Sequence, residues 1–191
     1  DVIKYPYPMT LTQLTEDTFE QLLSISKKSI DLQSTTFIDP YGMICILEIG
    51  ELLKPEGIQK TLYLPESEEV LKYLERMDFF KFADKYFGLE PSKPQISGKY
   101  LRSSYSDVLL EITPIEKSDD IHFIVGKVKE RANAILKKHL HYDEKAINGF
   151  IVALSEVCQN IIEHSETKGF VGIQKYFWQN LNKNIVKIAV M

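Results

Sequence analysis

The residues best suited to chemistry lie in the stretch L-S-E-V-C-Q-N-I-I-E-H-S, which begins at Leu154. On a helix turning about 100° per residue, four polar side chains form one stripe: Glu156, Asn160, Glu163 and His164. The opposite face is apolar, with Ile147, Phe150, Ile151, Leu154, Val157, Cys158, Ile161 and Ile162. A carboxylate one turn before an amide suits nucleotide chemistry. The carboxylate can take a proton from water or a hydroxyl, and the neutral amide oxygen can bind a Mg²⁺ ion whose charge the phosphates already neutralise.

The E-x-x-x-N spacing alone occurs on many ordinary surface helices. With its apolar surroundings and the following N-I-I-E-H-S, the pattern resembles the N-box of the GHKL ATPase superfamily. That superfamily includes DNA gyrase, mismatch-repair ATPases, histidine kinases and anti-sigma-factor serine kinases, and the likeness is strongest to the last group. The resemblance implies ATP and Mg²⁺ as cofactors, Glu156 as the general base and Asn160 as the Mg²⁺-holding residue. Glu163 and His164 would lie near the nucleotide, although either could simply complete the polar end of the helix.

The elements around this helix follow the same resemblance. Residues 108–112 read as a strand, Asp119 or Asp120 as the cap of a helix to about residue 140, and Asp143 as the cap of the N-box helix. Two strands should follow, at 170–178 and 185–190. Strand, helix, helix, strand, strand is the order with which an anti-sigma-factor kinase domain begins. Residues 108–191 are therefore expected to be the first part of a GHKL α/β sandwich, ending before the D-x-G-x-G box that binds adenine.

The N-terminal half has a different pattern. Residues 11–30 predict a helix, D-P-Y-G at 39–42 a turn, 43–53 a helix and 60–64 a strand, and the acidic run at 66–69 opens another helix. The runs F-I-D-P-Y-G-M, L-Y-L-P-E-S and R-M-D-F-F-K-F over residues 31–87 resemble a STAS domain, the fold of anti-sigma-factor antagonists. Pro40 stands where that family has its phosphorylated Ser. The resemblance therefore implies a docking or dimerisation surface and not a phosphorylation switch.

The expected fold class is α/β (α+β), in four parts. An N-terminal helical segment, 1–30, precedes a STAS-like βαβα module, 31–87. A linker rich in Pro, Gly and Ser, 88–107, joins this module to the GHKL-like part, 108–191. The aromatic run at 77–87 is interpreted as a helix end that packs into its own core.

Composition limits the function. Hydrophobic residues at 44% and charged residues at 26% are typical of a globular protein with a real core. The net charge of −4 argues against a protein whose surface coats nucleic acid, since such a surface is normally basic. No apolar stretch is long enough to span a bilayer, and the chain has no apolar signal core near residue 1. Cys45 and Cys158 sit in apolar helical patterns and are expected to be reduced, which favours a cytoplasmic protein, although the sequence leaves a disulfide open.

Two classes of function follow. The first is an enzyme, a bacterial signalling ATPase or serine kinase acting on a regulatory protein partner. The second is a binding protein, in which the STAS-like module docks with the ATP-binding module, the chain forms a homodimer or contacts a partner, and nucleotide switches these contacts. A scaffold that has lost nucleotide binding is a third. Residues 1–191 alone are expected to bind ATP weakly, since the adenine-binding box would follow Met191.

Overall fold

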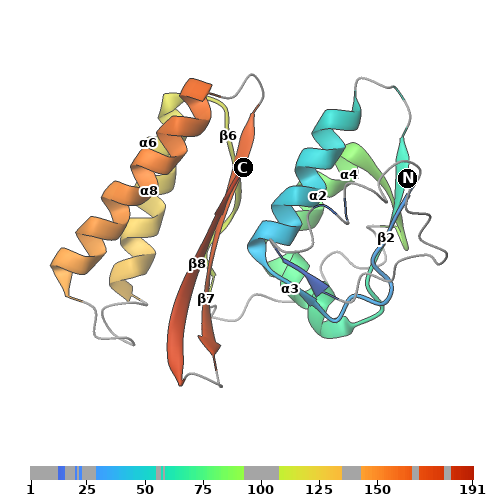
Figure 1. Cartoon of the computed structure of the whole chain (residues 1–191), viewed down its shortest axis with the longest axis horizontal. Helices are drawn as coiled ribbons and strands as arrows, with labels where there is room; N and C mark the ends of the chain where they lie inside the picture. Colours follow the sequence, from blue (N-terminus) through green and yellow to red (C-terminus); the bar gives the residue numbers. More distant parts are fainter. Residues whose placement is uncertain are drawn as a thin grey trace, which may run out of the picture.

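The computed structural model describes residues 13–15, 20, 22, 29–54, 57, 59–92, 108–134, 143–164, 168–178 and 182–191, without the side chains of 177, 178, 183 and 184. Helices and strands form four layers, seen edge-on in Figure 1: two helices, a three-stranded sheet, a second group of helices and a parallel sheet. The mixed α and β class expected from the sequence is confirmed.

The N-terminal half contains parallel strands joined through helices. One pair is β1 (Gln13–Leu14) with β3 (Phe37–Ile38), and the other sheet has the order β2 (Ser29–Asp31), β4 (Lys60–Tyr63), β5 (Phe87–Glu90). Its helices are α2 (Pro40–Leu53), α3 (Glu68–Arg76) and α4 (Phe79–Tyr86). Because parallel strands need long crossovers, α2 leads from β3 to β4, and α3 and α4 lead from β4 to β5.

Two expectations for this half are wrong. Residues 11–30 do not form one helix, because β1 lies near the start of this segment and β2 begins at its end. Pairing of these strands with later strands outweighed the helical spacing of the apolar residues. The D-P-Y-G segment begins α2 and is not a turn. The Asp39 carboxylate accepts the Gly42 N–H at 2.8 Å, and Pro40 occupies the first helical position, where it needs no hydrogen-bond donor.

Other expectations for this half are confirmed. Strand β4 and helix α3 lie where they were predicted, and Ser67 caps α3. The aromatic segment packs into the core through the side chains of Phe79, Phe80, Phe82 and Phe87. The linker expected at 88–107 is wrong at its start, because residues 88–90 belong to strand β5; residues 93–107 lie outside the described residues.

The C-terminal half consists of β6 (Val108–Ile115), α6 (Ser118–Ala132), α8 (Glu144–His164), β7 (Gly169–Trp178) and β8 (Lys183–Val190). The strands form an antiparallel sheet in the order β6-β7-β8. Asp143 accepts the Ala146 N–H at 2.7 Å, and Asp120 accepts the N–H groups of Glu116 and Lys117. Strand, helix, helix, strand, strand is thus confirmed as the element order, although α6 ends at Ala132 and residues 135–142 are not described.

Both faces of the β6-β7-β8 sheet are covered. On β7, Val171 and Ile173 point toward α6 and α8, whereas Phe170 belongs to the core of the N-terminal half. A Cβ at Gly172 would lie 3.3 Å from Met77 and 3.7 Å from Pro40. Since side chains alternate between the faces of a strand, β7 serves two cores. Helix α2 contacts both β7 and β8, so the two halves pack as one body (Figure 1). None of the helices in the described residues has the length and apolarity that a bilayer crossing requires.

Candidate functional site

The outer face of α8 carries the residues that the sequence analysis singled out. Glu156 and Asn160 are exposed and stand one helical turn apart, while Ile147, Leu154 and Cys158 are buried beneath them. The apolar side of α8 anchors the helix on the sheet and on α6, which leaves the polar stripe facing outward. A ligand on this face could therefore reach the carboxylate and the amide together.

Glu163 and His164 continue the same face to the end of the helix. Both are exposed, and the Glu163 carboxylate accepts a hydrogen bond from Gln159 at 2.9 Å. His164 is the last residue of α8, where an imidazolium would complement the negative end of the helix dipole. The structure thus brings all four predicted site residues onto one helix, with Glu163 already paired within it.

A buried cluster of charged side chains holds α6, the helix on which α8 packs, against the sheet. Glu111 on β6 is 4% exposed, and Arg131 on α6 donates to both of its carboxylate oxygens at 2.7 and 3.0 Å. Lys127 lies 2.9 Å from the same carboxylate. Burial alone would raise the pKa of Glu111, but the hydrogen bonds from Arg131 and Lys127 outweigh it and lower the pKa to about 2. This cluster fixes α6, on which α8 packs, to the sheet.

The side chains on α8 offer few ligands for Mg²⁺. Within the described residues, no group of three His, Cys, Asp or Glu side chains is arranged to hold a metal. Magnesium bound with a nucleotide commonly takes only one or two protein ligands, the rest being phosphates and water. Asn160, whose side chain is exposed one turn from Glu156, is the residue on α8 that could supply such a ligand.

A cavity of about 240 Å³ lies elsewhere, at the C-terminal ends of α2 and α4. Its lining includes three lysines: Lys54, Lys60 and Lys85. Because helix C-termini carry partial negative charge, cationic side chains gather there without any ligand. We therefore assign Lys54 and Lys85 to the two helix ends, whereas Lys60 is the buried first residue of β4. Glu156 and Asn160 do not line this cavity.

Both cysteines are free and buried, as expected. Burial raises the pKa of the Cys45 thiol to about 12 and that of Cys158 to about 11, so neither is suited to nucleophilic chemistry. His139 and His141, which form an H-x-H in the sequence, lie outside the described residues.

The contacts that join the two halves were missed by sequence reasoning. The Lys187 ammonium lies 2.6 Å from the Asp39 carboxylate, and the hydroxyls of Tyr73 and Tyr176 are 2.7 Å apart. The Ile112 N–H donates to the Met77 carbonyl at 3.0 Å. The only sequence signal for this packing is the nearly continuous apolar run V-L-L-E-I in β6, which is typical of a strand buried on both faces.

Comparison of the chain with protein-family models, with curated proteins and with solved structures finds no match.

Proposed function

We propose that this chain acts as a cytoplasmic regulatory protein that binds Mg²⁺ and ATP on the outer face of α8. The observation that supports this best is the exposure of Glu156 and Asn160 together, one turn apart, on a helix whose other face is buried. The element order from β6 to β8 is the one expected for the start of a GHKL domain. The STAS-like and GHKL-like assignments of the two halves remain part of this proposal.

In the catalytic form of the proposal, Glu156 is the general base. Its carboxylate takes the proton from water or from a serine hydroxyl of a partner, and the oxygen attacks the γ-phosphorus. The bond between that phosphorus and the β-γ bridging oxygen breaks, ADP leaves, and the products are inorganic phosphate or a phosphoserine. Asn160 would hold the Mg²⁺ through its amide oxygen, and Glu163 and His164 line the nucleotide. Bound Mg²⁺ would neutralise the charge on the phosphates.

The packing of the two halves bears on where a protein substrate would come from. Asp39 and Pro40 lie at the start of α2, on the face of the sheet that carries Lys187 and Ala189. Glu156 projects from α8 on the other face. The STAS-like half therefore cannot present the start of α2 to Glu156 within the same packed chain. In the kinase form of the proposal, this packing favours a serine substrate on another molecule.

The same packing favours a second candidate, a non-catalytic switch. The start of α2, where the resemblance places the phosphorylated Ser of STAS domains, is buried against the chain's own sheet, with Asp39 only 1% exposed. Nucleotide at α8 would then alter how firmly the halves hold together and how the chain contacts a regulatory partner or a second copy of itself. No catalysis is required for that role.

Turnover separates the two candidates. The natural protein that contains this chain would be assayed with Mg²⁺ and ATP, alone and with candidate partners, beside the variant Glu156→Ala and the control Glu130→Ala on the exposed side of α6. The enzyme proposal predicts that Glu156→Ala still binds ATP but loses turnover, whereas Glu130→Ala keeps it. Binding of ATP by the wild type with no turnover under any condition supports the switch. No ATP binding at all contradicts both.

A further inference from the structure

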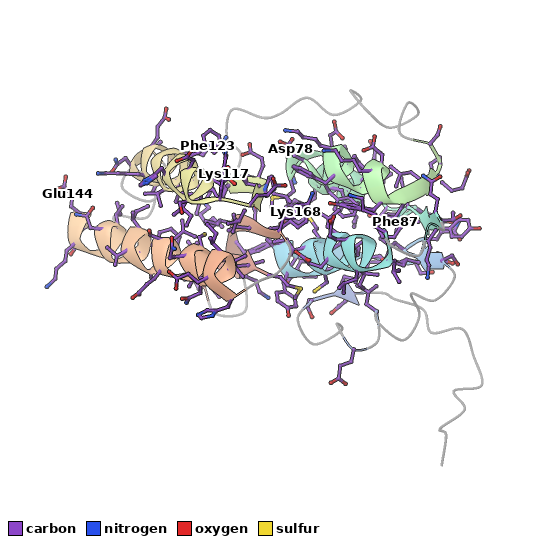
Figure 2. All side chains as sticks on the ribbon, turned by 90° about the horizontal axis from the view of Figure 1, so that it is seen from above. Asp78, Phe87, Lys117, Phe123, Glu144 and Lys168 are labelled. Atoms are coloured by element: carbon purple, nitrogen blue, oxygen red, sulfur yellow. The ribbon has the colours of Figure 1, made fainter. Side chains whose placement is uncertain are left out.

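A cluster of acidic groups and one lysine occupies the junction between the halves. Glu48 and Glu51 come from α2, Tyr86 from the end of α4, and Lys168 immediately precedes β7. Glu116, just after β6, completes the set. Figure 2 labels Lys168 between the C-terminal helices and helix α2 of the N-terminal half.

Lys168 is the cation that serves this cluster. Its ammonium lies 3.8 Å from the Glu51 carboxylate and 3.6 Å from that of Glu116, and over the rings of Tyr86 and Phe170 at 5.8 and 5.9 Å. Lys168 therefore contacts side chains from both halves, but its charge is shared between two carboxylates.

Glu48 and Glu51 each keep one carboxylate oxygen unsatisfied. Glu48 Oε1 and Glu51 Oε2 are buried and have no hydrogen-bond partner among the described residues. Burial, followed by repulsion from Glu51, raises the pKa of Glu48 to about 7, and Lys168 offsets only part of this rise. The other titratable groups near it are Cys45, with a raised pKa, and Tyr86, whose pKa burial and Glu51 raise.

We propose that Glu48, Glu51 and Lys168 form a proton-responsive latch between the two halves, closed when Glu48 is protonated and loosened when Glu48 is ionised. A neutral Glu48 can keep its buried Oε1 atom in place without a counter-charge. An ionised Glu48 repels Glu51 and carries charge on a buried oxygen that has no hydrogen bond, and opening of the junction relieves both costs. The latch does not depend on nucleotide binding at α8.

The sign of the pH effect follows from the raised pKa. In an open junction Glu48 would titrate near its ordinary value of 4.5, and in the closed junction near 7. The closed state thus binds more protons between these values, so opening becomes easier as the pH rises from 4.5 to 7 and changes little above that.

Hydrogen exchange of the Ile112 amide measures the opening, because its N–H donates to the Met77 carbonyl across the junction. After correction for the intrinsic exchange rate, the wild-type protection of Ile112 should fall about tenfold or more between pH 5 and pH 7.5. The Leu154 amide, inside α8, should keep its protection. Glu48→Gln should remove the pH dependence at Ile112, and the control Glu130→Gln should retain it.

Two neighbouring variants test the direction independently. Glu51→Gln removes the repulsion, so the fall in Ile112 protection with rising pH should end at a lower pH than in the wild type. Lys168→Gln removes the opposing cation, so this fall should end at a higher pH. Protection of Ile112 that does not depend on pH in the wild type, or that depends on pH equally in Glu48→Gln, overturns the proposal.

Discussion

Lys187 on β8 reaches the Asp39 carboxylate at the start of α2, with 2.6 Å between the ammonium nitrogen and Oδ2, although 148 positions separate the two residues. Asp39 is 1% exposed and also caps α2 through the Gly42 N–H. One carboxylate thus starts a helix in the first half and binds a strand of the second. The two halves form a single packed body through contacts of this kind.

Replacing Lys187 should weaken the whole chain. In Lys187→Met the Asp39 carboxylate stays buried and, among the described residues, keeps only its helix-capping bond. The free energy of unfolding should therefore fall by about 2 kcal/mol, a figure reduced for the partial exposure of Lys187. Urea denaturation followed by circular dichroism measures this loss. Lys129→Met, at an exposed position on α6, should change stability by less than about 0.5 kcal/mol. Equal effects of the two variants would refute a role for the Asp39 pair.

Glu111 should control how much the free energy of unfolding falls at low pH. Its folded pKa is about 2, below the unfolded value of 4.5, so its stabilisation is complete above pH 4.5 and is lost as the pH falls toward 2. The loss should be on the order of 3 kcal/mol. Urea midpoints measured from pH 6 to pH 2 should therefore decline more steeply in the wild type than in Glu111→Gln. Parallel declines would show that Arg131 and Lys127 do not hold an ionised Glu111.

Two glycines in helices should respond oppositely to alanine. A Cβ at Gly50 would lie 2.6 Å from Tyr86 Cβ, so Gly50→Ala must push α2 away from α4 and should cost about 2 kcal/mol or more. Gly126 on α6 has open space around it, so Gly126→Ala should stabilise by about 0.5–1 kcal/mol through helix propensity. Thermal melts of both variants check the pair. Tolerance of alanine at Gly50 would contradict the close approach of α2 to α4.

The local signals in the sequence predicted the C-terminal half well. Asp143 and the apolar spacing behind Glu156 placed α8, and the two strand-like runs placed β7 and β8, because caps and periodicity act over a few residues. The N-terminal strands β1 and β2 were missed because each is only two or three residues long and depends on partners far along the chain.

Residues at the junction of the halves could not be predicted by such signals. In the sequence, Lys187, Lys168 and Glu48 are ordinary charged positions on a strand, a turn and a helix. The contacts that these side chains make depend on which elements pack together. The stripe on α8 was foreseen because its four residues share one helix and need no tertiary contact to align.

Magnesium-dependent ATP binding tests the role of α8 most directly. Calorimetry on the natural protein that contains this chain should show ATP binding that strengthens with Mg²⁺. Asn160→Ala should weaken it by about tenfold or more, a loss of about 1.4 kcal/mol, through the missing amide oxygen. Asn148→Ala, an exposed asparagine on the same helix, should bind like the wild type. Binding that is unchanged in Asn160→Ala, or equally weakened in both variants, would contradict a nucleotide site on the outer face of α8.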